Sequence, residues 1–272
     1  MPSTLHRARP LLGTLVSVQL DDPRQDERAL QQASDAAFAT IARVHRCMSA
    51  HEATSDLARL ARAQAGDHVT VDPHTAAVLR LAQAWYAASG GAFDPHAAGR
   101  HLARAGTRPG LGEARGHAGS LPGLRVRDDH VVETDGPVQL DLGGIAKGYA
   151  VDQAVATLRA HGIGGGLVNA GGDLRAFGPR SWRIEVQHPV VRSRSRRLLQ
   201  VRDAAVATSL GAPGNADFVA TRRHAHRWHW STVLARDCAT ADALTKWALQ
   251  VAAPSLQLRA TLARAGARMW RE

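Results

Sequence analysis

The sequence is poor in the residue types that mark several classes of protein. Its two cysteines, Cys47 and Cys238, lie far apart and fit no CxxC pattern. This excludes a disulfide framework and gives no zinc-ligand spacing, so we expect both to be small core residues. No apolar run is long enough to cross a bilayer, and no signal peptide is visible at the N-terminus. We therefore expect no membrane span.

Aromatic residues are also scarce, at 4% of the chain, although the formal net charge is +10. A balance this basic raises the question of nucleic-acid binding. The arginines are scattered, however, apart from a run at residues 192–197 and a patch at 222–227, and no aromatic platform is interleaved with them. A solvated basic surface explains the charge better, so we expect no nucleic-acid partner.

Lysine is almost missing. Of the 34 basic residues only Lys147 and Lys246 are lysine, which makes arginine the default cation of this chain. A lysine kept against that bias suggests a need for a compact ammonium group instead of a planar guanidinium group. The bias therefore favours a chemical role for Lys147, which lies in a glycine-rich stretch.

The fold class follows from the length and from one central stretch. The chain is long enough for a single large domain over residues 1–272, which two sub-lobes at about 1–136 and 137–272 could make up. Alternating Val138, Leu140 and Leu142 predict a half-buried strand. Helical spacing then runs to Gly162, and a second strand begins at Leu167. This order predicts a central β-α-β unit with parallel strands in a mixed α/β (α+β) fold, with sheets flanked by helices.

A glycine turn joins the first strand of that unit to its helix. Free N–H groups and the helix dipole at such a turn attract anions, so Gly143 and Gly144 could cradle a phosphate. Lys147, in the first helical turn, would add a cation. A tight turn beside a solvated lysine is an equally good interpretation, and the residues alone leave both open.

Alternation, helical spacing and capping residues predict the other elements. They are strands at 11–20, 182–189, 230–235 and 267–270; helices at 26–48, 56–60, 74–88, from 238 and from 255; and hairpins near 124–133 and between 197–201 and 204–208.

Two segments carry a family resemblance. LDLGGIAKGYAVD at 140–152, followed by LVNAGGDLRAFG at 167–178, resembles the signature of the ApbE family, the FAD:protein FMN transferases. Weaker matching blocks extend over most of the chain. The resemblance implies an ApbE-like fold and an enzyme that moves FMN from FAD, with Mg²⁺, onto a Thr or Ser hydroxyl of an acceptor flavoprotein. Family members are often exported lipoproteins, but the lipobox cysteine is missing here, so we expect a cytoplasmic protein.

The resemblance assigns flavin-binding positions to several blocks of the chain. These positions are Leu12, His51, Ala92, Phe93, Asp94, Asp141, Lys147 and Thr208. Leu12 stands where the family usually has methionine. His51 stands where an aromatic residue lies against the flavin ring, and an exposed loop histidine is the alternative interpretation of it.

A further block, ADALTK at 241–246, resembles the A-D-A-L-x-T block that holds Mg²⁺ in the family. The metal ligands it implies are Asp242, Thr245 and the backbone carbonyl of Gly144. Lys246 stands where a metal-ligating threonine is usual. Its ammonium group could replace part of the metal's charge, or could pair with Asp242 and leave no metal, and both alternatives stay open.

The most serious departure from the family lies at residues 222–230. The usual H-x-I-D-P-x-T-G loop is replaced by RRHAHRWHW. One of the histidines at 224, 226 and 229 could serve as the catalytic base, and His226 is our candidate, alongside Asp242 and Lys246 as the other catalytic residues. A zinc cluster of His224, His226 and His229 is disfavoured, since strand alternation would scatter these side chains over both faces. The missing loop also keeps a second function open, a degenerate FAD-binding or FAD-hydrolysing protein without transferase activity.

Overall fold

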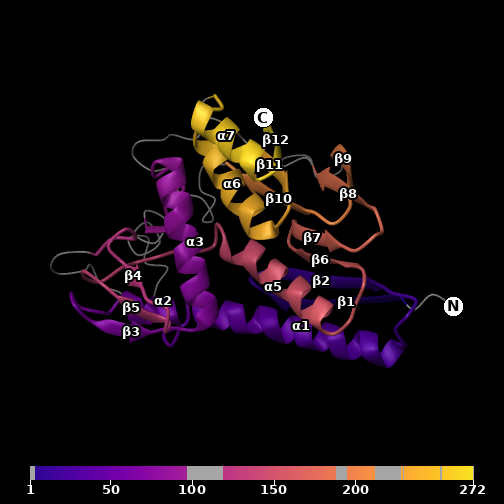
Figure 1. Ribbon diagram of the computed structural model, residues 1–272, viewed down its shortest axis with the longest axis horizontal. Helices are drawn as coiled ribbons and strands as arrows, with labels where there is room; N and C mark the ends of the chain where they lie inside the picture. Colours follow the sequence, from indigo (N-terminus) through magenta and orange to yellow (C-terminus); the bar gives the residue numbers. More distant parts are fainter. Residues whose placement is uncertain are drawn as a thin grey trace. The chain divides into compact units, whose positions relative to one another are not determined.

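The computed structural model describes residues 4–96, 119–187, 195–211, 228, 230–251 and 253–271 (Figure 1). The chain forms two compact units. The first contains Met1–Arg43, Lys147–Ala212 and His226–Glu272, and the second contains Val44–Ala146 and Pro213–Ala225. The first unit therefore draws on both ends of the chain. None of the described helices combines the length and apolar character that a transmembrane span requires.

A seven-stranded sheet forms the centre of the first unit. In spatial order its strands are β1 (Thr4–Leu11), β2 (Thr14–Asp21), β6 (Gly166–Ala170), β7 (Asp173–Phe177), β10 (Ala205–Leu210), β11 (Trp230–Ala235) and β12 (Arg268–Arg271). Each strand is antiparallel to its neighbours. The predicted strands at 11–20, 230–235 and 267–270 are thus confirmed as β2, β11 and β12, with boundaries shifted by a few residues.

Of the first hairpin, the sequence predicts only the second strand. β1 precedes β2, and Leu12 and Gly13 form the two-residue turn between them with φ of 55° and 70°. A tight hairpin turn needs left-handed backbone at both positions, which glycine adopts without strain and leucine does not. β1 escaped prediction because it is an edge strand in which Arg7 and Arg9 lie between Leu5 and Leu11 on one face and interrupt the apolar alternation.

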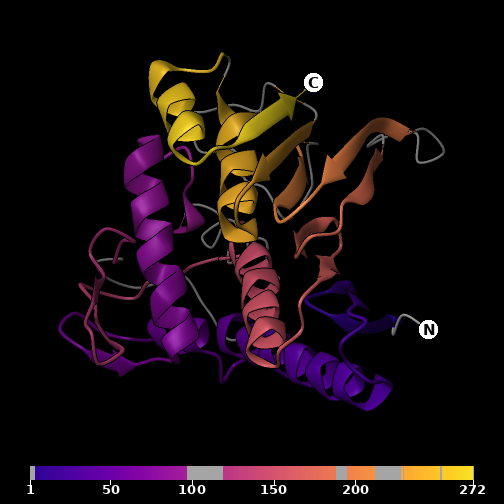
Figure 2. The ribbon, with the colours of Figure 1, turned by 45° about the vertical axis from the view of Figure 1, so that its right-hand side comes forward.

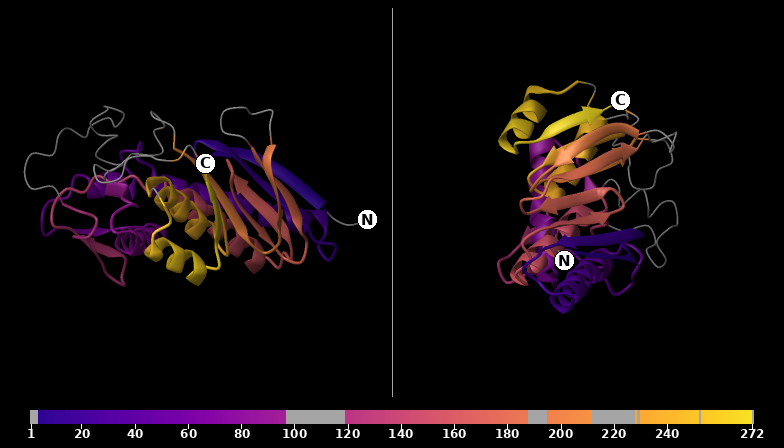
Figure 3. Two further views of the ribbon diagram at one scale, coloured as in Figure 1. Left: turned by 90° about the horizontal axis from the view of Figure 1, so that it is seen from above. Right: turned by 90° about the vertical axis from the view of Figure 1, so that its right-hand side faces the viewer.

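Helices cover one face of this sheet (Figures 1 and 3). They are the first part of α1 (Glu27–Met48), α5 (Ala146–Ala160) and α6 (Cys238–Gln250). Ser255 caps α7 (Leu256–Arg264), which leads into β12. All four helices were predicted, α1 and α5 from their apolar spacing and α7 from its capping residue, and Gly162 with φ of 78° ends α5 as expected.

A two-stranded sheet of β8 (Trp182–Gln187) and β9 (Ser195–Val201) lies against the other face. Its apolar side chains join a buried cluster with residues of β6, β7 and β10; the members include Leu167, Leu174, Val186, Leu199, Val201 and Val206. The predicted hairpin between 197–201 and 204–208 is therefore wrong. β9 pairs with β8, and β10 pairs with β7 and β11. Burial of each strand's apolar side chains, and not closeness in sequence, determines these pairings.

The central β-α-β prediction needs two corrections. Residues 138–142 are extended and alternately buried, but they join no sheet: the N–H of Val138 donates to Leu60 O (3.2 Å) and that of Asp141 to Pro95 O (2.9 Å). The second strand, β6, is antiparallel to both of its partners, not parallel. The alternation of apolar residues reflects the burial of one side of this segment, and such a segment can be buried without pairing with a strand.

The second unit is smaller and contains α2 (Asp56–Leu60), α3 (Pro73–Ser89) and a sheet of β3 (His68–Thr70), β5 (Val131–Glu133) and β4 (Arg125–Val126). Ser55 caps α2 and Asp72 caps α3, as predicted. The buried Asp56 carboxylate accepts from Asp72 N (2.8 Å) and Thr75 Oγ1 (2.6 Å), which ties the two helix starts together. The predicted hairpin near 124–133 is confirmed as β4 and β5.

Candidate active site

Helices α5 and α6 lie end to end in the first unit, with their N-terminal turns in contact (Figures 1 and 2). Asp152 on α5 accepts hydrogen bonds from the first two N–H groups of α6, those of Cys238 and Ala239, both at 2.9 Å. Asp242 on α6 accepts from Gly148 N, in the first turn of α5, at 3.3 Å. Each helix thus supplies a carboxylate to the start of the other, where the helix dipole favours negative charge.

Gly148 makes this contact possible. A Cβ atom at this position would lie 2.3 Å from the carbonyl oxygen of Cys238 and 2.9 Å from Ala239 Cα. Both are backbone atoms, which cannot move aside as a flexible side chain could. The close packing of the two helix starts therefore explains Gly148, the second glycine of GIAKGYAVD.

Alternate residues of β7 fix α5 against the sheet. Asp173 Oδ2 lies 3.5 Å from Lys147 Nζ, and Arg175 Nη1 lies 2.7 Å from Asp152 Oδ1. Further along, the guanidinium of Arg159 stacks over the Phe177 ring, 5.7 Å from its centroid. Because these strand residues share one face of the sheet, they set the rotation of α5 and hold Lys147 above the start of β7.

The second lysine is buried nearby. Lys246 Nζ donates to Asp242 Oδ1 at 2.8 Å and to Ser209 Oγ in a short hydrogen bond, and lies 3.5 Å from Thr245 Oγ1. Thr245 Oγ1 in turn donates to Asp242 O and lies within hydrogen-bonding distance of Ser209 Oγ, both at 2.6 Å. Lys246 is 7% exposed and Asp242 fully buried.

Asp173 completes the group, which we call the lysine cluster: Lys147, Asp173, Ser209, Asp242, Thr245 and Lys246. Burial and, second to it, the nearby charge of Asp242 raise the pKa of the Asp173 carboxyl to about 7, against the opposing effect of Lys147 and Lys246. The cluster contains two ammonium groups and two carboxyl groups. It is therefore close to neutral in total but strongly polar inside.

Comparisons with known proteins identify the family of this chain. A profile of the ApbE family matches residues 12–262. The chain belongs to the ApbE family. A relative named FAD:protein FMN transferase, from Treponema pallidum, is 30% identical over 236 residues, 75% of this chain and 63% of that protein. One of the same name from Rhodobacter capsulatus is 32% identical over 149 residues, 46% of this chain and 26% of that protein. The chain thus spans less than two thirds of the length of these relatives.

Solved structures support the fold. The flavin transferase ApbE from Vibrio cholerae has a TM-score of 0.79 at 23% identity, covering 100% of this chain and 94% of that one. An ApbE protein from Thermotoga maritima also gives 0.79 at 23% identity, with coverage of 99% and 94%. The mixed α/β, ApbE-like fold predicted from the sequence is confirmed.

The structure brings together four of the residues that the ApbE resemblance singled out: Lys147, Asp242, Thr245 and Lys246. Thr208 does not join them. Its neighbour Ser209 faces α6, so Thr208 faces the other side of the sheet, where its hydroxyl lies 2.9 Å from that of Thr232. Leu12 lies in the turn between β1 and β2.

The remaining predicted positions of this ApbE-family chain belong to the second unit. His51 is exposed, while Ala92 and Phe93 are buried. The carboxylates of Asp94 and Asp141 accept from nearby loop N–H groups, those of His96 (2.9 Å) and Gly143 (2.8 Å). Gly144 follows in the same turn. His226, the predicted base, lies outside the described residues, as do His224 and His229.

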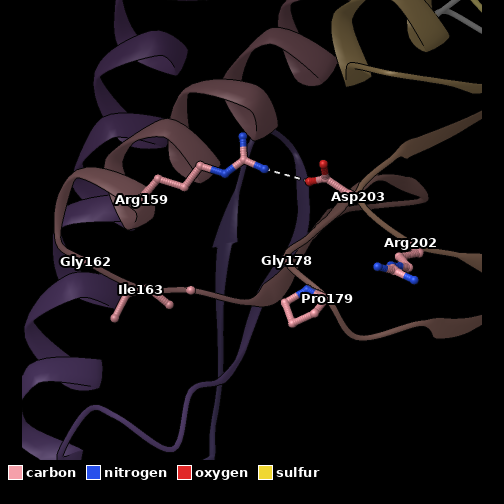
Figure 4. Close-up of a pocket in the computed structure, with 8 residues that line it drawn as sticks. Arg159, Gly162, Ile163, Gly178, Pro179, Arg202 and Asp203 are labelled. Atoms are coloured by element: carbon pink, nitrogen blue, oxygen red, sulfur yellow. Dashed lines mark hydrogen bonds and ion pairs between the residues drawn. The ribbon is translucent and has the colours of Figure 1, made fainter.

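Two of the concavities that the described residues form open in the first unit. One, of about 770 Å³, lies beside β8 on the face of the sheet away from α6; its lining includes Thr14, Asn169, Trp182, Val206 and Thr208. The other, of about 500 Å³, lies at the C-terminal end of α5, where Arg159 reaches across to Asp203 at 2.7 Å (Figure 4). This second pocket contains none of the predicted site residues, and its ion pair already offsets the charge of Arg159.

Sequence reasoning missed three residues of this region. Asp152 ends the KGYAVD motif, but only the structure shows that it caps α6. Asp173 was noted in the NAGGD turn without a role. Ser209 was passed over for its neighbour Thr208, although strand alternation across β10, read from the buried Ala205 and Ala207, would have placed Ser209 on the helix-covered face.

Replacing Gly148 with alanine should separate the two helix starts. We expect a loss of stability, because overpacking costs about 1–3 kcal/mol and exceeds the roughly 1 kcal/mol that alanine gains over glycine in a helix. Thermal unfolding followed by circular dichroism measures it. Gly143→Ala is the matched control, since its Cβ would meet only the Asp141 side chain, at 3.1 Å. An unchanged melting temperature for Gly148→Ala would contradict the packing argument.

Asp173 should make stability depend on pH. Its pKa is about 7 in the folded protein against 3.8 as the model-compound value, so between these values the folded state holds a proton that the unfolded chain has released. The free energy of unfolding should therefore fall as pH rises from about 4 to about 7. Asp173→Asn should flatten this slope, by an amount on the order of a few kcal/mol across the window. Urea unfolding at several pH values tests it, and parallel slopes for the two proteins would rule the effect out.

Proposed function

We propose that this ApbE-family chain transfers FMN from FAD to a Thr or Ser hydroxyl of an acceptor flavoprotein. The observation that carries the proposal is Lys147, the 28% exposed ammonium group of the lysine cluster, which lies in the first turn of α5. An ammonium group at a helix N-terminus suits a pyrophosphate, which brings negative charge to the site and gains more during its cleavage. Family membership and the transferase names of its relatives point in the same direction.

The proposed reaction is a phosphoryl-type transfer. The acceptor hydroxyl oxygen attacks the phosphorus of the FMN half of FAD and forms a phosphoester bond. The P–O bond to the AMP half breaks, AMP leaves with the bridging oxygen, and the hydroxyl proton passes to a base. No oxidant or reductant is consumed. The protein has to position the two partners and neutralise charge, as in other phosphoryl transfers.

Within the cluster the two lysines have different surroundings. The Lys147 side chain is 28% exposed, in the first turn of α5, where it could reach a phosphate oxygen while Asp173 holds it. Lys246 is buried and orients the Asp242 carboxylate, which in turn holds Gly148 N. In this proposal Lys147 contacts the substrate, and Lys246 holds the Asp242 carboxylate that binds the first turn of α5. His226 stays the predicted base.

The flavin half would be bound by the remaining predicted positions. They are Leu12, His51, Ala92, Phe93, Asp94, Asp141 and Thr208, as the family resemblance implies. Thr208 requires a separate test because its hydroxyl faces the large concavity beside β8. The acceptor protein and a cytoplasmic location also stay predictions from the sequence.

The predicted Mg²⁺ site fits the described side chains poorly. Asp242 Oδ1 accepts from an ammonium group and Oδ2 from a backbone N–H, and the Thr245 hydroxyl is bonded to Asp242 O and Ser209. Among the residues that the structure describes, no group of three or more His, Cys, Asp or Glu side chains could hold a metal. We therefore derive no step through a metal ion, and Mg²⁺ with Asp242, Thr245 and the Gly144 carbonyl stays a prediction.

A second candidate function is a degenerate relative that binds or hydrolyses FAD without modifying a protein. The observation in its favour is the sequence RRHAHRWHW at 222–230, which lacks the family's H-x-I-D-P-x-T-G loop. The same chemistry with water as the acceptor would release FMN and AMP.

Mass spectrometry separates these functions. The chain is incubated with FAD and a protein that a named FAD:protein FMN transferase modifies, with that transferase as the positive control. We expect an FMN adduct on a Thr or Ser of the acceptor, together with AMP, and a loss of at least about tenfold in rate for Lys147→Met because a transition-state charge contact is removed. Free FMN and AMP without an adduct would establish a hydrolase, and intact bound FAD a carrier.

The matched control is Arg28→Met. Arg28 is an exposed cation of α1 outside the lysine cluster and outside the concavity beside β8, so removing it takes away one positive charge without touching the site. Equal losses for Arg28→Met and Lys147→Met would show that overall charge, and not the cluster, matters.

A further inference from the structure

Both lysines of this chain lie in one buried cluster. Every other basic residue of the 34 is an arginine. Lys147 pairs with Asp173, and Lys246 pairs with Asp242. An arginine at position 246 would bring a planar group with five donors into a place where only three oxygen atoms converge. A compact cation with three donors is what this place accommodates.

The three N–H groups of Lys246 match those three oxygens. One donates to Asp242 Oδ1 (2.8 Å), one makes the short bond to Ser209 Oγ, and the third points to Thr245 Oγ1 at a longer 3.5 Å. These acceptors come from α6 and β10, so the ammonium group joins a helix to the sheet. With Lys246 at 7% exposure, water has little access to replace these bonds.

A divalent ion cannot share this position. Mg²⁺ requires oxygen ligands at about 2.0–2.1 Å in an octahedron. An ion bound to Asp242 Oδ1 would lie beside the ammonium group that is already 2.8 Å from the same oxygen, and the two cations would repel in a buried site. Asp242 Oδ2 is taken by Gly148 N. The Thr245 and Ser209 hydroxyls lie 2.6 Å apart and bond to each other.

The charges of the cluster lead to the same conclusion. Lys246 already balances Asp242, whose carboxylate is 0% exposed. A divalent ion added to this balanced pair would leave two positive charges uncompensated and out of contact with water, which is strongly unfavourable.

We propose that the Lys246 ammonium group is the resident cation of this site, so that the chain binds no divalent metal at Asp242 and Thr245. Lys246 is then a positioning residue: it fixes the Asp242 carboxylate and, through it, the first turn of α5. The inference rests on the proposed function only for its consequence, an FMN transfer that needs no added metal.

The two-lysine composition allows a direct test on the unmodified chain. Protein labelled with ¹³C-lysine gives two ¹³Cε signals, which a Lys147→Arg variant assigns. Mn²⁺ is a paramagnetic probe that takes the same oxygen ligands as Mg²⁺ and broadens nearby signals. We expect the Lys246 signal to keep its width at sub-millimolar Mn²⁺. Broadening of that signal, reversed by excess Mg²⁺, would overturn the proposal.

A variant provides the converse test. Lys246→Thr removes the ammonium group and adds a hydroxyl, so we expect it to bind one Mn²⁺ at least about a hundredfold more tightly than the wild type, since a buried like charge is removed. Electron paramagnetic resonance of free Mn²⁺ measures the binding. Lys147→Thr, at the other lysine, is the matched control and should bind no better than the wild type. A folded Lys246→Thr protein that binds no better than this control would contradict the inference. Should that variant not fold, the lysine signals decide alone.

Activity measurements separate this inference from the proposed function. FMN transfer that continues in EDTA at its full rate supports both. Transfer that stops in EDTA and returns with Mg²⁺ overturns the resident cation while leaving the transferase in place. An absence of transfer under either condition, with Lys246 signals unaffected by Mn²⁺, refutes the transferase and leaves the resident cation standing.

Discussion

Two helix starts meet between α5 and α6, and each carries the partial positive charge of a helix dipole. Brought together without compensation, these ends would repel one another. Asp152 and Asp242 remove the repulsion by capping reciprocally, each on one helix and bonded to the N–H groups of the other. Burial raises the pKa of Asp152, although N–H bonds from Cys238 and Ala239 and the charge of Arg175 oppose this effect. Buried charges of opposite sign thus offset one another at this junction. A further charged group nearby would need a partner of the opposite charge.

The lysine cluster follows from this junction. Asp242 Oδ2 accepts a hydrogen bond from Gly148 N, so Oδ1 remains available to a cation. Lys246, one turn further along the same helix, supplies that cation. Ser209 and Thr245 supply the remaining acceptors. An ammonium group is held by directed hydrogen bonds, whereas a metal would need a shell of oxygens that this junction does not leave available. The substitution of a lysine at one position therefore changes which cation the whole region can hold.

Much of this architecture is visible in the sequence, and what is not has a physical reason. Apolar spacing predicts α1 and α5, capping residues predict α3 and α7, and alternation predicts β2 and β8, because each of these patterns lies within one element. They do not indicate which strands pair with one another. The segment at 138–142 alternates without joining a sheet, and β9 pairs with β8 instead of β10, since pairing depends on surfaces far away in the sequence. For the same reason the ion pair of Lys246 with Asp242 was foreseeable at a spacing of four residues, while the bond to Ser209 was not.

The edges of the seven-stranded sheet have a consequence for how the protein is made. One edge is β1, near the start of the chain, and the other is β12, near its end. During synthesis the β1–β2 hairpin is made well before β6, the strand with which β2 pairs, and before β10, β11 and α6. The segment Val44–Ala146, by contrast, carries its own sheet and leaves the ribosome as a continuous piece. The unit that holds both lysines is therefore completed only after the segment Val44–Ala146 has been made, and its sheet depends on long-range contacts, which form slowly.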